Sequence, residues 1–577
     1  MTREQIDELI AQQRYRDAAA ALSTMWAAAP TPGTAAFVVA RFERIAPHLS
    51  LTALRIFILR SFTIEPLVPV LRARCYAAGL DASIHLGDYN VFEQYVLDGA
   101  SAMYAHAPDV IVLAALTRDV APALWDGRHV RAEDVAATAR RITDWIDGIR
   151  RHSAASIVVQ SMEQPATPAH GVLDLRLDHG QREAIADVNR SIISAARAQR
   201  GVYVLDYDAL VARHGRDAWG DPHKDLAMRV PLRPDAYGAL AAEYMRLLHP
   251  LSGRVCKAIA VDLDNTLWGG ILGEDGPTGL AMGTEYPGPA FRAFQQQLRI
   301  LSDRGILLTV CSKNNPDDAM AVLREHPDML LRPDDFAAMR INWTDKAANI
   351  RELAAELNIG VDAFAFFDDN PVEREWVRSQ LPEVTVIDAG NDPVHYAERL
   401  RQSPVFERLS VSDEDRARTE QYRAQRQRAE AASSGTVEDF LAGLQMVATL
   451  DHVTPATLAR VAQLTQKTNQ FNVTTRRYSE EQVAQLAADP AVLVRTVRVA
   501  DRYGDNGLVG VVIARVDGPR CVIDTLLLSC RVIGRGVETL MLADVSEEAR
   551  RRGASALAGE FLPTAKNVPE FLNWLKA

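Results

Sequence analysis

Short apolar runs recur along the chain, and longer stretches of helical periodicity lie between them. In the first part of the chain, such runs predict buried strands at 54–59, 83–86, 110–113 and 156–159. Amphipathic stretches at 131–149 and 181–199 predict helices. Because strands and helices alternate, this part of the chain predicts a parallel, flavodoxin-like α/β sheet.

Further along, apolar runs end in polar side chains. Strands are predicted at 258–261, 306–312 and 363–367. The polar residues that end or follow these strands are Asp262, Asp264, Ser312, Asp368 and Asp369. In an open parallel α/β sheet the carboxyl ends of the strands form the edge that binds ligands, so these side chains are expected to lie together.

These residue types indicate phosphoryl chemistry. Carboxylates two residues apart along a strand end offer hard oxygen ligands to Mg²⁺. Asp262 is placed to attack phosphorus, and Asp264 to shuttle a proton. Lys346 starts a helical pattern at 346–357 and can neutralise charge on a pentavalent phosphorus. For the first motif alone, the alternative is a strand followed by an acidic turn.

The order of these motifs resembles the haloacid dehalogenase (HAD) phosphotransferase superfamily. The matching positions are Asp262, Asp264 and Thr266 in the first motif, Ser312 in the second, Lys346 in the third, and Asp368 and Asp369 in the fourth. The resemblance implies a HAD-like Rossmannoid core and Mg²⁺ bound by Asp262, Asp264, Asp368 and Asp369. It implies substrate phosphate bound by Thr266, Ser312, Lys313 and Asn314.

Longer segments narrow the resemblance to the FkbH-like family of polyketide biosynthesis. These segments are 261–276, 311–315, 341–346 and 367–374. Enzymes of that family dephosphorylate 1,3-bisphosphoglycerate and deliver the glyceryl group to the phosphopantetheine thiol of an acyl carrier protein. The resemblance implies the same substrate and partner here, with Cys311 carrying the glyceryl group as a thioester.

Alternatives remain open at this point. Cys311 can instead be a small buried residue, as free cysteines in strands often are. The chain can be a plain HAD-type phosphatase, or a scaffold without catalysis that binds a carrier protein. The flap segment, 268–276, is rich in glycine and too short for a lid domain. It predicts a hairpin beside an open mouth, which suits a bulky prosthetic arm.

The region before the core, 1–250, predicts a helical segment followed by a domain faintly similar to SGNH hydrolases. Ser61 follows the first strand, where the nucleophile of that family lies. Arg60 precedes it in place of the family's Gly-Asp pair, and Asp221-Pro-His223 has one spacer where the family has two. A docking or structural module is therefore predicted rather than a hydrolase.

The core is assigned to 251–410, a charged helical linker to 411–435 and a GNAT-like α/β domain to 436–577. In this last domain the segment 531–536, Arg-Val-Ile-Gly-Arg-Gly, precedes a helical pattern. Free N–H groups and the helix dipole favour an anion there. The segment resembles the pyrophosphate-binding signature of GNAT acyltransferases. That resemblance implies pantetheine binding by Arg531, Gly534 and Gly536.

Composition limits the classes of function. A chain of 577 residues is too long for one core. The net charge of −11 disfavours general nucleic-acid binding, and no apolar run is long enough to predict a membrane span. The start of the chain predicts no targeting leader. Five cysteines without paired spacing indicate free thiols, as expected in a reducing cytoplasm.

Overall fold

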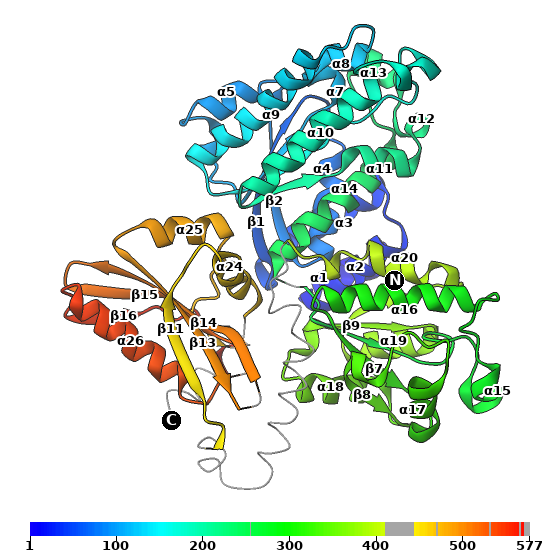
Figure 1. The fold of residues 1–577 in the computed structure, drawn as a ribbon, viewed down its shortest axis with the longest axis vertical. Helices are drawn as coiled ribbons and strands as arrows, with labels where there is room; N and C mark the ends of the chain where they lie inside the picture. The colour runs from blue at the N-terminus through cyan, green and yellow to red at the C-terminus, as the bar shows by residue number, and fades with distance from the viewer. Residues whose placement is uncertain are drawn as a thin grey trace. The chain divides into compact units, whose positions relative to one another are not determined.

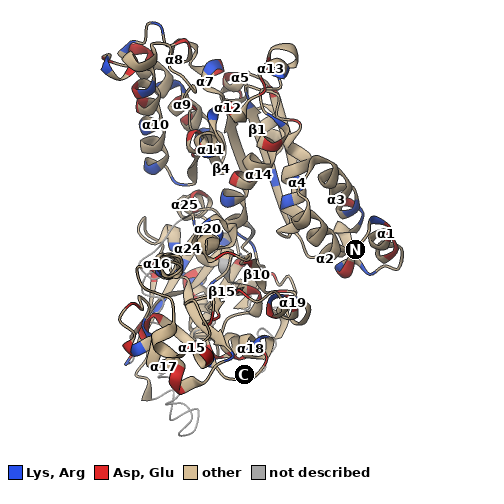
Figure 2. Ribbon diagram, turned by 90° about the vertical axis from the view of Figure 1, so that its right-hand side faces the viewer, with Lys and Arg blue, Asp and Glu red and all other residues tan. Residues whose placement is uncertain are grey.

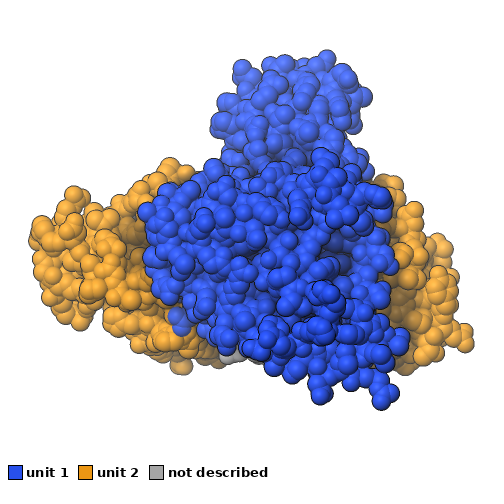
Figure 3. Space-filling view, turned by 90° about the horizontal axis from the view of Figure 1, so that it is seen from above, with its two compact units in different colours: residues 1–252, 479–482 blue, residues 253–478, 483–577 orange. Residues whose placement is uncertain are grey.

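The computed structural model describes residues 1–577 except 254, 410–442, 469–470, 503, 530–531, 565–566 and 570–577. The predicted linker, 411–435, thus lies outside the described residues. The chain forms two compact units, residues 1–252 with 479–482 and residues 253–478 with 483–577 (Figure 3). Basic and acidic residues are interspersed over the helices (Figure 2). Among the described helices, none combines the length and apolarity needed to cross a bilayer.

The first unit contains a parallel five-stranded sheet in the order β2-β1-β3-β4-β5. This is the predicted flavodoxin-like order. Its strands are β1 (Thr52–Arg60), β2 (Leu80–Tyr89), β3 (Val110–Ala114), β4 (Ser156–Gln160) and β5 (Val202–Leu205). Its helices are α1 (Arg3–Ala11), α2 (Tyr15–Ala28), α3 (Pro32–Ile45), α4 (Leu67–Ala77), α5 (Phe92–Leu97), α6 (Ala102–Ala105), α7 (Thr117–Val120), α8 (Pro122–Asp126), α9 (Ala132–His152), α10 (Gln181–Ala198), α11 (Tyr207–His214), α12 (Arg216–Trp219), α13 (Pro222–Met228) and α14 (Pro234–Leu248).

A second parallel five-stranded sheet, in the order β10-β9-β6-β7-β8, carries the predicted motifs. Its strands are β6 (Ala258–Val261), β7 (Leu307–Ser312), β8 (Phe336–Ile341), β9 (Phe364–Asp368) and β10 (Thr385–Asp388). Its helices are α15 (Leu272–Gly279), α16 (Gly288–Asp303), α17 (Pro316–Glu325), α18 (Lys346–Glu356), α19 (Pro371–Gln380) and α20 (Tyr396–Gln402).

Helices cover both faces of this second sheet (Figure 1). Ala258 and Ala260 of β6 pack in the cluster that includes α18 and α19. Ile259 and Val261 pack in the cluster that includes α16, α17 and α20. A strand that is covered on both faces has to be apolar at every position, which is why β6 shows no alternation of polar residues. Polar chemistry is therefore confined to the carboxyl edge.

The third sheet has the order β11-β13-β14-β15-β12, with β16 beside β15. Neighbouring strands are antiparallel except for the parallel pair β15 and β16. The elements are β11 (Val447–His452), α24 (Leu458–Lys467), β12 (Phe471–Asn472), α25 (Glu480–Ala488), β13 (Val492–Asp501), β14 (Gly504–Asp517), β15 (Arg520–Leu528), α26 (Val537–Arg551) and β16 (Ala556–Gly559).

The flap segment is not the predicted hairpin, because it carries the short helix α15. An isolated bridge pairs Gly269 with Ala281, which lies after the helix. The N–H of Ile271 donates to the Asp275 carboxylate at 2.8 Å, which satisfies a donor at the start of the helix. Gly276, with φ +66°, interrupts the helix. Asp275 thus stabilises a helical turn, a role that the glycine pattern did not reveal.

Gln295 of α16 ties the loop after β6 to the segment before β8. Its side chain is fully buried. Nε2 donates to the Leu267 carbonyl at 2.9 Å, and Oε1 accepts the N–H groups of Leu330 and Leu331 at 2.9 and 3.3 Å. One side chain therefore satisfies buried backbone groups from two loops, one of which holds the first motif.

Gln295→Leu should destabilise this sheet, because it leaves these backbone groups without partners at about 1–3 kcal/mol for each unsatisfied group. Hydrogen exchange of peptides from β6 and β7 measures the loss. Gln296→Leu, the same change at the exposed neighbouring position, is the control. Equal exchange rates in the two variants would contradict the role assigned to Gln295.

Candidate active site

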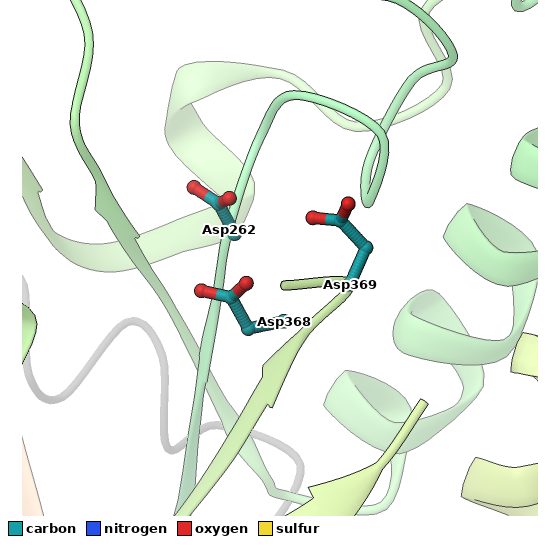
Figure 4. A group of neighbouring side chains, drawn as sticks. All are labelled: Asp262, Asp368 and Asp369. Carbon is teal, nitrogen blue, oxygen red and sulfur yellow. The ribbon is translucent and has the colours of Figure 1, made fainter. Parts of the chain in front are cut away.

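Three carboxylates converge at the carboxyl edge of the second sheet (Figure 4). Asp262 follows β6, Asp368 ends β9 and Asp369 follows it; one oxygen of each lies within 4.8 Å of the others. The Asp262 N–H donates to the Phe367 carbonyl at 3.1 Å, which keeps β6 and β9 paired up to the cluster. The structure thus brings together two acidic motifs that lie far apart in the sequence.

Lys346 lies between two of these carboxylates. It is the first residue of α18, and the Asp345 side chain caps that helix by accepting the Ala348 N–H at 3.0 Å. Lys346 Nζ is 3.0 Å from Asp262 Oδ2 and 2.5 Å from Asp368 Oδ2, with only 4% of its side chain exposed. Burial lowers the pKa of Lys346, but the two carboxylates outweigh it and raise the pKa above its ordinary value.

One ammonium does not neutralise three carboxylates. Burial, and then the charge of Asp262, raise the pKa of Asp368 to about 7 despite its bond to Lys346. The same two causes raise the pKa of Asp369. Asp262 Oδ1 is buried and has no hydrogen-bond partner in the part of the chain that the structure describes. Closely spaced oxygen donors with excess negative charge are the set that a divalent cation prefers.

The acidic pair is held by partners from several segments. The Thr266 hydroxyl is 3.3 Å from Asp369 Oδ1 and accepts the Asp369 N–H at 3.1 Å. Arg374 is buried, and its Nη1 donates to the carbonyls of Asp368 and Asp369 at 2.8 and 2.6 Å. Arg374 was missed in the sequence because its role depends on how α19 folds back. Its place in α19 just after the fourth motif was the available signal.

Asp264 lies outside this cluster. Its Oδ1 accepts from Trp268 Nε1 at 2.9 Å and from the Leu272 N–H at 3.1 Å, and its Oδ2 accepts from Asn314 Nδ2 at 3.0 Å. The Asp264 side chain is therefore hydrogen-bonded to these three donors and is not part of the cluster of Asp262, Asp368 and Asp369. A part for Asp264 in metal binding would fall to its backbone carbonyl.

The predicted phosphate-binding residues differ in whether their side chains already have protein partners. Ser312 is buried at the end of β7. Lys313 Nζ is 2.6 Å from Glu373 Oε1, so this ammonium already has a counter-ion. Asn314 and Thr266 each bond to an aspartate of the site. All four lie in the loops or strand end around the cluster, but protein partners already occupy three of them.

Cys311 lies beside Asp262 in the sheet, because Val310 is in register with Val261. Its thiol is fully buried in the apolar cluster under α18 and donates to the Lys346 carbonyl at 3.6 Å. Burial raises the pKa of the Cys311 thiol well above its ordinary value, and Lys346 only partly opposes this. In this conformation the thiolate form of Cys311 is disfavoured. The nearby cation of Lys313 is paired with Glu373.

The predicted pantetheine site lies at the start of α26. Arg531 is outside the described residues. Gly534 and Gly536 adopt positive φ angles of 75° and 80°, which glycine tolerates at little cost. However, the buried Glu538 carboxylate accepts the Gly534 N–H at 2.6 Å. An internal carboxylate thus uses a donor that the resemblance assigns to a pyrophosphate.

The edge of β15 beside this turn is also occupied. Leu528 and Leu527 pair with Phe471 and Asn472 of β12, and the Val473 N–H donates to the Leu526 carbonyl at 3.1 Å. Because β12 already pairs with this edge of β15, an extended pantetheine arm cannot pair with the same backbone groups. The basic residues Arg551 and Arg552 are paired with Glu548 at 3.1 and 3.0 Å. Pantetheine binding by this domain stays a prediction.

In the first unit, Ser61 follows β1 as predicted. Its hydroxyl donates to Asp119 Oδ2 at 2.8 Å and accepts the Leu116 N–H at 2.9 Å, and it is fully buried. His223 is exposed on α13, and Asp221 caps that helix by accepting the Lys224 N–H at 3.1 Å. Ser61 is thus hydrogen-bonded to a carboxylate and a backbone N–H, and a docking or structural role for this domain stays a prediction.

A solved structure that contains a phosphatase domain is similar to more than half of this chain. No family model and no curated protein matches the chain. The N-terminal part of the protein BF1531 from Bacteroides fragilis, which contains a phosphatase domain and was crystallised with Mg, is 26% identical. The alignment covers 63% of this chain and 96% of that one, with a TM-score of 0.58.

Two other solved structures align with smaller parts of the chain. The ribosomal-protein-S18-alanine N-acetyltransferase of Escherichia coli is 15% identical, covers 22% of this chain and 76% of its own, and has a TM-score of 0.18. An acetyl xylan esterase of Geobacillus stearothermophilus is 12% identical, covers 34% of this chain and 96% of its own, and has a TM-score of 0.24. Similarity at these scores supports no conclusion about this chain.

Lys346→Met should destabilise the second sheet by about 3–5 kcal/mol, because it leaves buried carboxylates without their counter-charge. Hydrogen exchange of peptides from β6 and β9 measures the change in the free energy of unfolding. The control is Lys224→Met, since Lys224 and Asp221 form a partly exposed pair 3.5 Å apart. If the two variants lose equal stability, the cluster does not depend on Lys346.

Proposed function

We propose that this chain is a magnesium-dependent phosphatase of the HAD type. The observation that carries the proposal is the buried cluster of Asp262, Asp368 and Asp369 with Lys346, at the ligand-binding edge of a parallel sheet. The similarity to a phosphatase domain that was crystallised with Mg supports the same reading.

The three carboxylates fit Mg²⁺, because they supply hard oxygens and an excess of negative charge that one lysine leaves unbalanced. Asp262, Asp368 and Asp369 would hold the ion. When bound, Mg²⁺ would neutralise charge on the phosphoryl group and on these carboxylates. The neighbour with Mg supports the predicted cofactor.

The residues divide the chemistry between them. Asp262 Oδ1, the oxygen without a donor, attacks phosphorus, and the bond from phosphorus to the substrate oxygen breaks. Asp264 gives a proton to that oxygen and later takes one from the water that hydrolyses the aspartyl-phosphate. Lys346 keeps Asp262 Oδ2 fixed, so that Oδ1 is presented to the substrate.

The finer part of the proposal names the substrate and the acceptor. In this proposal the substrate is 1,3-bisphosphoglycerate, and its glyceryl group passes to the phosphopantetheine thiol of an acyl carrier protein. Its support is the resemblance of the four motif segments to the FkbH-like family.

The proposed reaction has a phosphoryl half, given above, and an acyl half. In the acyl half, the Cys311 thiolate attacks the carbonyl carbon of the mixed anhydride. The bond from that carbon to the phosphate oxygen breaks, and phosphate leaves. The carrier thiolate then attacks the thioester and releases Cys311. Both exchanges preserve the acyl oxidation state, so no redox partner is needed. Because Cys311 is buried under α18, this route requires the contact between Cys311 and the Lys346 carbonyl to open.

Asp262→Asn should lower release of the ester phosphate of 1,3-bisphosphoglycerate on the order of 10³-fold or more, because the amide is a poor nucleophile. Removal of divalent ions by a chelator should abolish release by the wild-type chain, and added Mg²⁺ should restore it. Loss of the ester phosphate is measured by mass spectrometry of the substrate and products. Asp303→Asn, at an exposed position of α16, should leave the rate unchanged.

The outcomes separate the open alternatives. Phosphate release without acyl loading of any carrier, read by intact mass over a panel of pantetheinylated carriers, leaves a plain phosphatase. If no phosphorylated substrate releases phosphate in an Mg²⁺-dependent reaction, the remaining alternative is the scaffold without catalysis that binds a carrier protein. Either result removes the glyceryl-transfer part, and the second removes the whole proposal.

Cys311→Ala should abolish a glyceryl adduct on the protein while phosphate release from the phosphate ester continues, because the thiol serves the acyl half alone. Intact mass after a short incubation with 1,3-bisphosphoglycerate detects the adduct. Cys256→Ala is the matched control, since Cys256 is equally buried and burial raises the pKa of its thiol to about 12. An adduct that persists in the Cys311 variant would rule out the thioester on that residue.

A further inference from the structure

Asp264 is held at both carboxylate oxygens by donors from three separate places. Trp268 lies in the same loop, Leu272 begins α15, and Asn314 follows β7. A carboxylate that accepts bonds at both oxygens cannot rotate about its terminal torsion without losing at least one of them. Its direction is therefore set by the surrounding side chains.

Asn314 is itself fixed. Its side chain is 5% exposed, and its Oδ1 accepts the N–H of Asn315 at 3.0 Å. Because the amide oxygen is used in this way, the amide nitrogen faces Asp264 Oδ2. The orientation follows from the hydrogen bonds on both sides of the amide.

Trp268 is also immobile. Its ring is fully buried in the core on the α16 side of the sheet, with its Nε1 donating to Asp264 Oδ1. A buried indole N–H needs an acceptor, and here Asp264 is that acceptor. The packing of the ring thus determines where one oxygen of Asp264 lies.

We infer that Asn314 and Trp268 are positioning residues for the proton transfer by Asp264, an inference that rests on the proposed phosphatase function. They hold the Asp264 carboxylate outside the acidic cluster of Asp262, Asp368 and Asp369. Neither residue touches the reacting phosphorus. This role differs from the phosphate-binding role predicted for Asn314.

The inference has a chemical signature. Protonation of the leaving oxygen matters when the leaving group is a strongly basic alkoxide, and matters little when it is a stabilised phenolate. Misplacing Asp264 should therefore slow the attack on an alkyl phosphate and largely spare the attack on an aryl phosphate. A general loss of structure would slow both.

The experiment compares glycerol 3-phosphate with 4-nitrophenyl phosphate, in the full-length protein with Mg²⁺. The first-turnover rate of phosphoenzyme formation is followed by rapid quench and intact mass, which excludes the shared hydrolysis step. In Trp268→Phe and in Asn314→Ala, the rate with glycerol 3-phosphate should fall on the order of 10²-fold, the usual contribution of general acid catalysis. The rate with 4-nitrophenyl phosphate should change little.

Trp268→Phe keeps a buried ring and removes only the donor, so it tests the inference even if Asn314→Ala folds poorly. Asn315→Ala is the matched control, because the Asn315 side chain bonds to Asp318 at 2.8 Å instead of Asp264. Equal falls on both substrates, or no fall on either, would overturn the inference. If the wild-type protein forms no phosphoenzyme on these two substrates or on 1,3-bisphosphoglycerate, the proposed function fails instead.

Discussion

The two ion pairs of Lys346 with Asp262 and Asp368 are the interaction on which the site depends. They join β6, β9 and α18 at one point, and all three side chains are nearly inaccessible to water. Burying charge is costly unless each group is paired, and here one cation serves two anions while a third carboxylate lies beside them. The fold therefore carries an electrostatic imbalance at the place where a cation and a phosphoryl group would enter, and the rest of the site is arranged around it.

Much of the fold follows from the sequence. Continuous apolar runs such as 258–261 are typical of strands covered on both faces, and alternation with helices predicts the parallel order of the first two sheets. The carboxyl-edge rule then places Asp262 near Asp368, although they lie far apart in the chain. The supporting contacts do not follow, because they depend on how individual side chains are directed. Arg374 donates to the carbonyls of Asp368 and Asp369 across the turn from β9 into α19, and the flap segment carries a short helix in which Asp275 accepts the Ile271 N–H.

The two halves of the proposed reaction have different support. Phosphoryl transfer rests on side chains that the structure brings within bonding distance of one another. Acyl transfer rests on the family resemblance, and Cys311 is a buried thiol that donates to a backbone carbonyl. In the last domain, β12 covers the edge of β15 and Glu538 bonds the turn before α26. These internal contacts are satisfied without a partner, so an incoming prosthetic arm would have to displace them.

One hydrogen bond connects the flap segment to Asp264. The Leu272 N–H at the start of α15 donates to the same Asp264 oxygen that accepts from Trp268. The start of α15 and the direction of the Asp264 carboxylate are therefore linked through one backbone donor. A displacement of this helix would remove that donor from Asp264, while the bonds from Trp268 and Asn314 would remain.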